Sequence, residues 1–510
     1  MSTRTPAAAA NSPAVSERTP AVVMWLVAAA FVVILNETIM MNAIPQLMVG
    51  LDIDEAAAQW LSTAFLLTMA AVIPVTGWFL QRVSTRAAFA TAMSVFIIGT
   101  ALATIAPTYP VLLAARIIQA SGTAVMMPLL MTTLMTVVPQ SNRGRVMGNV
   151  TLVMSVAPAL GPAVSGLLLG LGSWRFMFLT VLPIAVVVTI LALRKLPNVG
   201  EPQQVSIDWL SVVVAALGFG GLVFGLSRFG QGLGAQPWVM VGVSVLAILG
   251  FVLRQLHLQR RGNPLLDLRT FRRPVFTKAV VLLSVSFMAM LGAMMLLPLY
   301  LQQARGLSAL EAGLMVMPGG IAMGLLGPRV GHIFDRFGSR LLIIPGAVGI
   351  ALAMGSLTLI DINTPYWQIL VAHLVLMISL AGVFTPTFTL GLGDVPAHLY
   401  SHASSLLGTL QQVAGALGTA IVITIMTAQA NRLVAGGTPP LEATVEGMRW
   451  GFVFGAVIAL VVVGLVLLMP NRLPDSEPEV ESAGEQEGEL AEEMPDLGVA
   501  EALPVHGDPH

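Results

Sequence analysis

The chain contains no cysteine, and it carries few charges for its length. None of its 510 residues is cysteine, which excludes disulfides, thiol catalysis and thiolate metal sites. Only 10% of the residues are charged and 56% are hydrophobic, whereas a soluble domain has about 25% charged residues. Most of the surface is therefore expected to face something other than water.

Several kinds of chemistry are also missing. No glycine-rich phosphate-binding loop ends in lysine, so ATP is not expected to drive the protein. No Ser/His/Asp or Cys/His set is recognisable, so a membrane-embedded lipid-modifying enzyme is a remote alternative. Asp394, His398 and His402 have the spacing of a helical metal site. Pro396 interrupts that helix, so we expect no metal site there. We also expect no cofactor and no nucleic-acid partner.

What the sequence has is fourteen apolar runs, each near the length of one bilayer span. Lipid accepts only helices and closed barrels as spanning structures, and about 20 apolar residues make a helix that crosses the hydrocarbon core. We therefore expect an all-α polytopic membrane protein. The expected spans are 21–46, 58–81, 87–106, 110–138, 145–171, 175–193, 208–228, 237–257, 275–301, 311–331, 340–360, 365–390, 403–428 and 449–470.

Basic residues are unequally distributed among the connections between these spans. With a cytoplasmic N-terminus, 19 of the 25 Lys and Arg residues lie on the inner side and five on the outer side. Because basic residues favour the cytoplasmic side, we expect both termini in the cytoplasm and a multi-pass protein of the inner (cytoplasmic) membrane.

The two tails differ from the rest of the chain. Residues 1–20 are predicted to be a disordered leader, and the apolar run that follows is too long for a signal peptide. Residues 473–510 hold twelve of the 26 acidic residues and no basic residue, so they are predicted to be an acidic disordered tail.

An internal repeat divides the spans. At an offset of 257 residues, the segment around Arg116 aligns with that around His373, and Ala159–Ala163 aligns with Ala416–Ala420. At an offset of 254, Gly77 and Arg82 align with Gly331 and Arg336. The repeat predicts two six-helix bundles, 21–193 and 275–470, on either side of an inserted helix pair, 208–257. An alternating-access site is expected at the interface of the bundles.

Short motifs occur at corresponding places in the repeat. A loop motif runs from Gly331 to Arg340 in the second half, and its degenerate first-half copy has Gln81 where the second half has Asp335. The motif residues are Gly77, Arg82, Gly331, Asp335, Arg336, Gly338 and Arg340 in the loops, Arg116, Gln119 and Gly122 in the fourth span, Gly161, Pro162 and Gly166 in the fifth, and Asn36 and Glu37 in the first.

With this layout, residues 21–472 resemble the fourteen-span drug:proton antiporters of the major facilitator superfamily, in the multidrug and lincomycin-type efflux branch. The resemblance implies proton-coupled efflux of amphipathic small molecules, with the proton gradient as energy source. It also implies that the lipid bilayer, the substrates and protons are the partners, and that the protein functions as a monomer. Many relatives carry an acid at the position of Asn36, whereas here the acid is Glu37, about 100° further around the helix.

Glu37 and Arg116 are the residues predicted to couple protons to transport. A charge inside a span is costly, so such residues usually have a function. We predict that Glu37 accepts a proton from the outer side and releases it inward while substrate competes for the site. The alternatives are a Glu37 that only locks helix packing and an Arg116 that reaches to the outer interface.

The remaining candidates concern the cavity and the moving parts. A substrate cavity is assigned to Asn36, Asn42, Met126, Met127 and His373, because flexible methionines suit varied ligands, although His373 and the methionines are also ordinary packing residues. Gly161, Pro162 and Gly166 of the fifth span look like the antiporter motif of this family. The motif is predicted to be a hinge, and close helix packing is its alternative. Asp335, Arg336 and Arg340 are predicted to form an ion-pair network with helix ends, with membrane orientation alone as the alternative.

Together these features predict a proton-coupled exporter that works by rocking of the two bundles. An exporter of one endogenous lipid or secondary metabolite is the nearest alternative, and a receptor without transport is a further one.

Overall fold

The computed structural model describes residues 21–170, 172–199, 202–229, 234–261 and 264–473. Every regular element in these ranges is helical, and fourteen helical segments are long and apolar enough to cross a membrane. The predicted all-α fold with fourteen spans is confirmed. The predicted leader, 1–20, and nearly all of the acidic tail, 474–510, lie outside the described residues.

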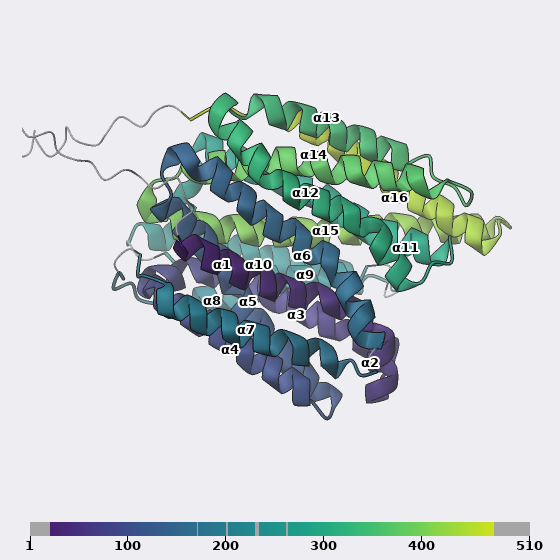
Figure 1. Ribbon diagram of the computed structural model, residues 1–510, viewed down its shortest axis with the longest axis horizontal. Helices are drawn as coiled ribbons and strands as arrows, with labels where there is room; N and C mark the ends of the chain where they lie inside the picture. The colour runs from purple at the N-terminus through teal and green to yellow at the C-terminus, as the bar shows by residue number, and fades with distance from the viewer. Residues whose placement is uncertain (1–20, 171, 200–201, 230–233, 262–263, 474–510) are drawn as a thin grey trace, which may run out of the picture. The chain divides into compact units, whose positions relative to one another are not determined.

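The first six spans use α1 to α7, coloured purple to blue in Figure 1. Capping side chains fix where two of them begin: Asp54 accepts a hydrogen bond from the Ala57 N–H at the start of α3, and Ser84 accepts one from Ala87 at the start of α4. The helices are α1 (Ala21–Ile39), α2 (Ile44–Leu51), α3 (Glu55–Arg82), α4 (Thr85–Ile105), α5 (Tyr109–Val137), α6 (Arg143–Gly170) and α7 (Arg175–Lys195).

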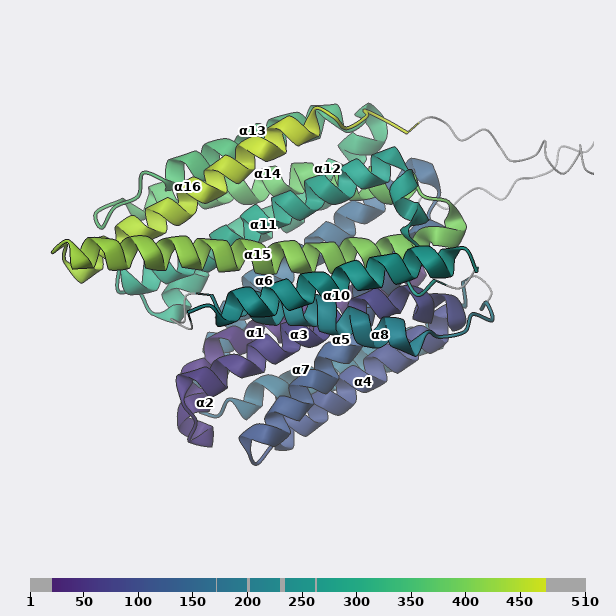
Figure 2. The same ribbon diagram turned by 180° about the vertical axis from the view of Figure 1, so that it is seen from behind.

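The inserted pair follows and faces the viewer in Figure 2. Its first span is α8 (Trp209–Ala215), one π-helical turn (Ala216–Gly220) and α9 (Gly221–Ser227), and its second is α10 (Gln236–Gln259). Glycines in the π-helical turn allow the close approach of α10, since a Cβ at Gly218 would lie 2.8 Å from Ile248. The first span packs on α3, and α9 contacts both α3 and α15.

The last six spans differ most from the expected boundaries. A capping box of Ser308 and Glu311 begins α12, which ends only at Phe337, before Gly338 with its φ of +86°. The segment from Gly331 to Phe337 is thus helical rather than a loop, and α16 begins nine residues before the predicted start of the last span. The helices are α11 (Pro274–Gln303), α12 (Ala309–Phe337), α13 (Arg340–Leu357), α14 (Tyr366–Gly393), α15 (Tyr400–Ala435) and α16 (Pro440–Val466).

The sequence repeat is visible in the short helical turns that join these spans. The turn η2 (Gln140–Asn142) precedes α6, and η5 (Ala397–Leu399) precedes α15. The two turns begin 257 residues apart and also end 257 residues apart, which is the offset of the sequence repeat. The equivalence makes α6 the counterpart of α15, and the offset of 254 makes α3 the counterpart of α12.

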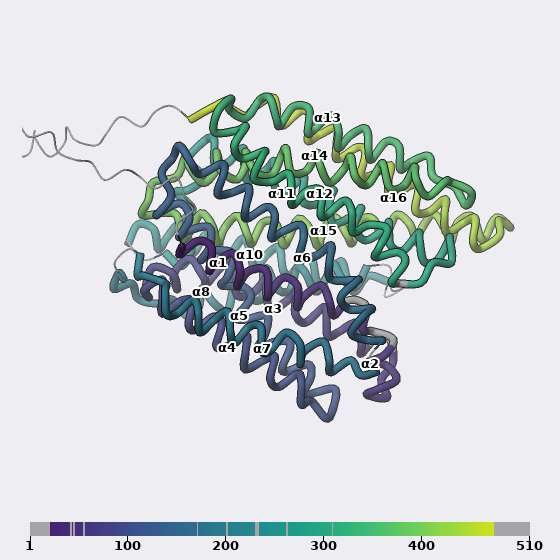
Figure 3. The backbone as a smooth tube through the Cα atoms, viewed as in Figure 1, coloured from purple at the N-terminus to yellow at the C-terminus, as the bar shows by residue number. Residues whose placement is uncertain are grey.

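Two seams join the halves of the repeat. One is formed by α6 and α12, which can be followed along each other in Figure 3, and the other by α3 and α15. We call the end of the helices at which α3, α12 and α16 finish the arginine-rich end, because the connections there carry most of the basic residues.

Candidate transport site

Glu37 lies in the last turns of α1, beside the junction of α1 with α6. Its neighbour Asn36 is buried, and the Asn36 side-chain nitrogen has no hydrogen-bond partner. Thr38 packs so closely on α6 that a Cβ at Gly161 would overlap the threonine hydroxyl. Glu37 as a whole residue is only partly buried.

Arg116 on α5 is only 1% exposed and is among the largest fully buried side chains of the described residues. Its Nη1 donates a hydrogen bond to Gln119 Oε1 at 3.0 Å, and Gln119 in turn donates to Thr100 Oγ1 at 2.9 Å. The guanidinium lies 4.2 Å from the ring centre of Phe65 on α3. This network faces inward, so the alternative in which Arg116 reaches to the outer interface is wrong.

The Arg116 guanidinium still lacks acceptors. Its Nε has no hydrogen-bond partner, and an unsatisfied buried donor on a charged group is costly. Glu37 is the acid with which Arg116 interacts electrostatically, although no ion pair within 4.0 Å joins the two among the described residues. The two groups therefore influence each other without a direct contact.

The residues assigned to the substrate cavity are not all brought together. Met126 is fully buried and Met127 only partly. His373 lies on α14 in the other bundle, where a ring nitrogen is 3.0 Å from the Val316 carbonyl oxygen of α12. The side chain of Asn42 lies outside the described residues.

The antiporter motif of α6 lies where three helices meet. Gly161 faces Thr38 of α1, and a Cβ at Gly313 of α12 would lie 2.6 Å from the Pro162 side chain. Gly166 faces Leu310, at the start of α12. The motif therefore contacts both the helix with the acid and the opposite half of the protein.

At the arginine-rich end, the α6–α12 seam is joined by Asp335. Its two carboxylate oxygens accept hydrogen bonds from the Gly144 N–H at 2.9 Å and the Arg145 N–H at 2.8 Å. Both N–H groups lie in the first turn of α6, where the helix dipole favours an anion. A Cβ at Gly331 would overlap the Gly144 carbonyl oxygen, so the two backbones touch here.

The predicted ion-pair network is wrong for Arg336 and Arg340. None of the ion pairs among the described residues includes either side chain. The Arg336 guanidinium lies 5.2 Å from the ring centre of Phe337, and the Arg340 backbone N–H donates to Asn471. Asp335 meets backbone N–H groups instead, because the end of α12 points at the start of a helix.

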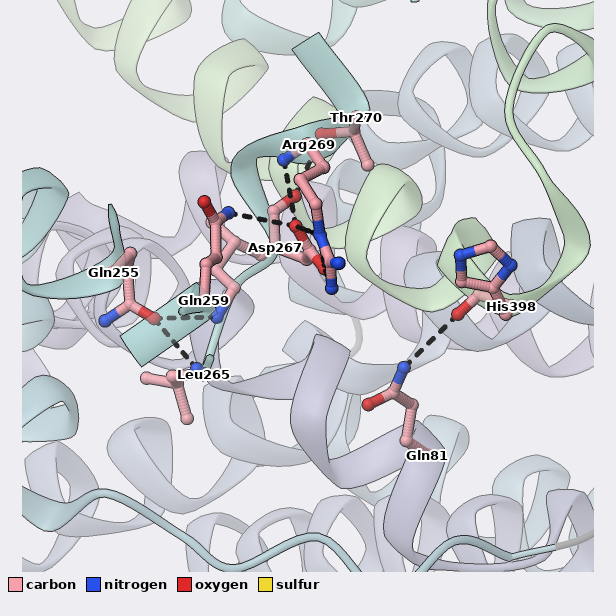
Figure 4. Close-up of polar contacts among 9 residues, drawn as sticks. Gln81, Gln255, Gln259, Leu265, Asp267, Arg269, Thr270 and His398 are labelled. Atoms are coloured by element: carbon pink, nitrogen blue, oxygen red, sulfur yellow. Dashed lines mark hydrogen bonds and ion pairs between the residues drawn. The ribbon is translucent and has the colours of Figure 1, made fainter. Parts of the chain in front are cut away.

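The α3–α15 seam is closed at the same end by neutral groups. Gln81 Nε2 donates to the His398 carbonyl oxygen at 3.3 Å, as Figure 4 shows, and the hydroxyls of Thr76 and Ser405 are 2.6 Å apart. Gly77 allows the approach of α15, since a Cβ there would lie 3.0 Å from the His402 ring. Arg82 is exposed at the end of α3.

Two contacts that the sequence analysis did not anticipate lie between the seams. Arg143 donates a hydrogen bond to the Tyr400 hydroxyl at 3.3 Å, and Thr151 and Thr385 are 2.8 Å apart. Arg143 and Tyr400 are 257 residues apart, which is the offset of the repeat. Residues related by a two-fold repeat touch only near its axis, so the offset was a signal that could have located this contact.

These observations define an all-helical, multi-pass membrane transporter, and comparisons with known proteins give its family. The sequence model of the Major Facilitator Superfamily matches residues 26–419, so the chain belongs to this superfamily and is a transporter, not an enzyme.

Two curated relatives and one solved structure illustrate the similarity. The chain is 40% identical to the uncharacterized MFS-type transporter YcnB of Bacillus subtilis (strain 168), over 85% of this chain and 91% of that one. It is 39% identical to the lincomycin resistance protein LmrB of Listeria innocua, over 84% and 92%. The crystal structure of the human organic anion transporter MFSD10 (TETRAN) shares the fold, with a TM-score of 0.60 at 13% identity, over 88% of this chain and 100% of that chain.

Proposed function

We propose that the protein exports amphipathic small molecules, including antibiotics, across the cytoplasmic membrane in exchange for protons. The observation that carries the proposal is the pair of Glu37 and Arg116: an acid and an unsatisfied buried guanidinium that interact inside one bundle without an ion pair. The name of the lincomycin resistance relative supports antibiotics as a substrate class.

The exchange requires that protonation of Glu37 alter its interaction with Arg116. With Glu37 ionised, the carboxylate attracts the guanidinium, and with Glu37 protonated this attraction is lost. A substrate whose polar or cationic group binds the ionised Glu37 carboxylate takes the place of the proton on that group. Proton and substrate therefore exclude each other at Glu37, which is the condition for antiport.

The change of access uses the two seams. With the arginine-rich end on the cytoplasmic side, the contacts of Asp335 with α6 and of Gln81 with His398 close that side. We infer that this conformation faces outward. Rocking breaks these contacts and separates the halves on the cytoplasmic side, while the antiporter motif keeps α1, α6 and α12 in register on the other side.

The test is transport by the purified full chain in proteoliposomes with an imposed pH gradient. A panel of lincosamides, cationic dyes and other antibiotics is offered, and substrate flux and proton flux are recorded together. We expect the intact protein to move at least one of them against its concentration, and Glu37→Gln to abolish both fluxes because the side chain no longer ionises.

Glu442→Gln is the matched control, because Glu442 is an exposed acid in the first turn of α16 and the chemical change is the same. It should transport as the unmodified protein does. Unchanged exchange by Glu37→Gln would overturn the coupling role. Export of one extracted lipid or metabolite without any drug would replace drug efflux by the endogenous-substrate alternative.

A further inference from the structure

A basic pocket lies at the arginine-rich end of the second half, apart from the transport site. It is a cavity of about 390 Å³ between the start of α11 and the turn η5. Arg269, Arg272, Arg273 and His398 line it together with apolar groups that include Pro396 and Leu399. The proposed transport mechanism uses none of the three arginines.

The acidic groups near this pocket are already engaged. Asp267 forms an ion pair with Arg269 at 2.6 Å and also accepts a hydrogen bond from Gln259 (Figure 4). Asp394 accepts hydrogen bonds from the Val275 and Phe276 N–H groups at the start of α11.

Arg272 and Arg273 therefore face the pocket without a carboxylate partner in the described part of the chain. Both are exposed, and the pocket carries a net positive charge that an anion would neutralise.

The position of the pocket selects the kind of anion. It lies level with the ends of the spans, where phospholipid headgroups lie, and guanidinium groups match the geometry of phosphate. Phe271, next to Arg272, is 38% exposed, and exposed aromatic rings at span ends are typical of the membrane interface. The apolar lining residues Pro274, Pro396 and Leu399 suit a glycerol backbone better than they suit a free ion.

We propose that this pocket binds the phosphate of an anionic phospholipid headgroup and thereby favours closure of the arginine-rich end. His398 connects the two roles, because it lines the pocket while its carbonyl oxygen accepts the hydrogen bond from Gln81 of α3. A phosphate bound between the arginines and His398 holds η5 in place. The first turns of α15, which follow η5, then stay packed on α3.

The test measures lipid retention by native mass spectrometry of the full chain. The protein is released from vesicles of phosphatidylcholine alone or of phosphatidylcholine mixed with phosphatidylglycerol. We expect phosphatidylglycerol to remain bound to the unmodified protein, and R272Q/R273Q to retain it roughly tenfold less well. R260Q/R261Q is the control, because it removes two exposed charges from the same connection without touching the pocket.

Three further arms decide the outcome. R272K/R273K, which keeps the charge, should retain more phosphatidylglycerol than R272Q/R273Q. Equal unfolding midpoints in phosphatidylcholine should show that all variants fold. Inorganic phosphate should not displace the lipid, and complete displacement would overturn the lipid assignment in favour of a free-phosphate site. Equal retention by R272Q/R273Q and R260Q/R261Q, or equal retention of both lipids by the unmodified protein, would overturn the proposal.

Discussion

The two seams between the halves are related by the sequence repeat, yet they are built from different chemistry. Position 335 on α12 and position 81 on α3 correspond at an offset of 254. Asp335 accepts hydrogen bonds from two N–H groups at the start of α6, one on each carboxylate oxygen. Gln81 makes one longer hydrogen bond, to the carbonyl oxygen before α15. Equivalent places in the fold thus carry a strong contact on one side and a weak one on the other.

Packing along the seams differs in the same direction. On the α6–α12 side, glycines bring the two backbones into contact: a Cβ at Gly148 would overlap the Gly327 carbonyl group. On the α3–α15 side, a Cβ at Gly408 would lie 3.3 Å from a methyl group of Ile73. We infer that the α6–α12 seam resists separation of the halves more strongly than the α3–α15 seam does.

The largest expected effect is a difference in stability between two single variants, each of which adds one methyl group to one seam. Gly148→Ala should destabilise the protein by about 3 kcal/mol, because backbone on the opposite helix cannot move aside. Gly408→Ala should cost less than about 1 kcal/mol, because the Ile73 side chain can adjust. Thermal unfolding of the two purified variants measures the difference, and equal losses would remove the distinction between the seams.

A smaller effect is expected at the charged contact. Asp335→Asn removes the negative side chain from the start of α6, which should cost about 1 kcal/mol and shift the protein toward a conformation open at the arginine-rich end. Because the chain has no cysteine, a single cysteine at Ser405, which is buried beside α3, reports this opening by its labelling rate with a maleimide. Labelling should rise several-fold in Asp335→Asn.

The matched variant for this experiment is Gln81→Leu, which removes the corresponding neutral contact. It should raise the labelling rate of the cysteine at position 405 less than Asp335→Asn does. A larger rise for Gln81→Leu would reverse the assigned order of the two contacts.

The smallest expected effect concerns the inserted pair, which contacts the α3–α15 seam. Asp208 precedes α8 and receives two hydrogen bonds from Arg254 at 2.6 and 2.7 Å. These hydrogen bonds, helped by Ser211, lower the pKa of Asp208 to about 2 despite partial burial. Because the folded pKa lies below the unfolded value of 3.8, the stabilisation is present above about pH 4 and is lost as the pH falls toward 2.

Asp208→Asn should therefore unfold at a lower temperature than the unmodified protein at neutral pH, with a loss below about 1 kcal/mol for so accessible a pair. The gap between the two unfolding midpoints should narrow on acidification below pH 4. A gap that stays constant with pH would contradict the role of the ionised carboxylate.

The spans and the family followed from the sequence because hydrophobic length and motif spacing are local properties. The end of α12 did not: the helix continues past the apolar run, so Asp335 and Arg336 occupy helical turns that hydropathy assigns to a loop. The partners of Asp335 depend on how α6 and α12 pack, which no local pattern contains. Arg116 was found as a charge in a span, whereas Phe65, which packs on its guanidinium, and Thr100, which accepts a hydrogen bond from Gln119, have no distinctive sequence signal.

The position of α9 has a consequence for how a molecule leaves the protein. This helix contacts both α3 and α15, and its own outer neighbour α10 turns side chains such as Leu246 and Leu253 outward. On this flank, α9 and α10 therefore separate a solute between the two bundles from the bilayer. Under the export function that we propose, the substrate therefore leaves on this flank along the membrane normal, into water, and not sideways into lipid.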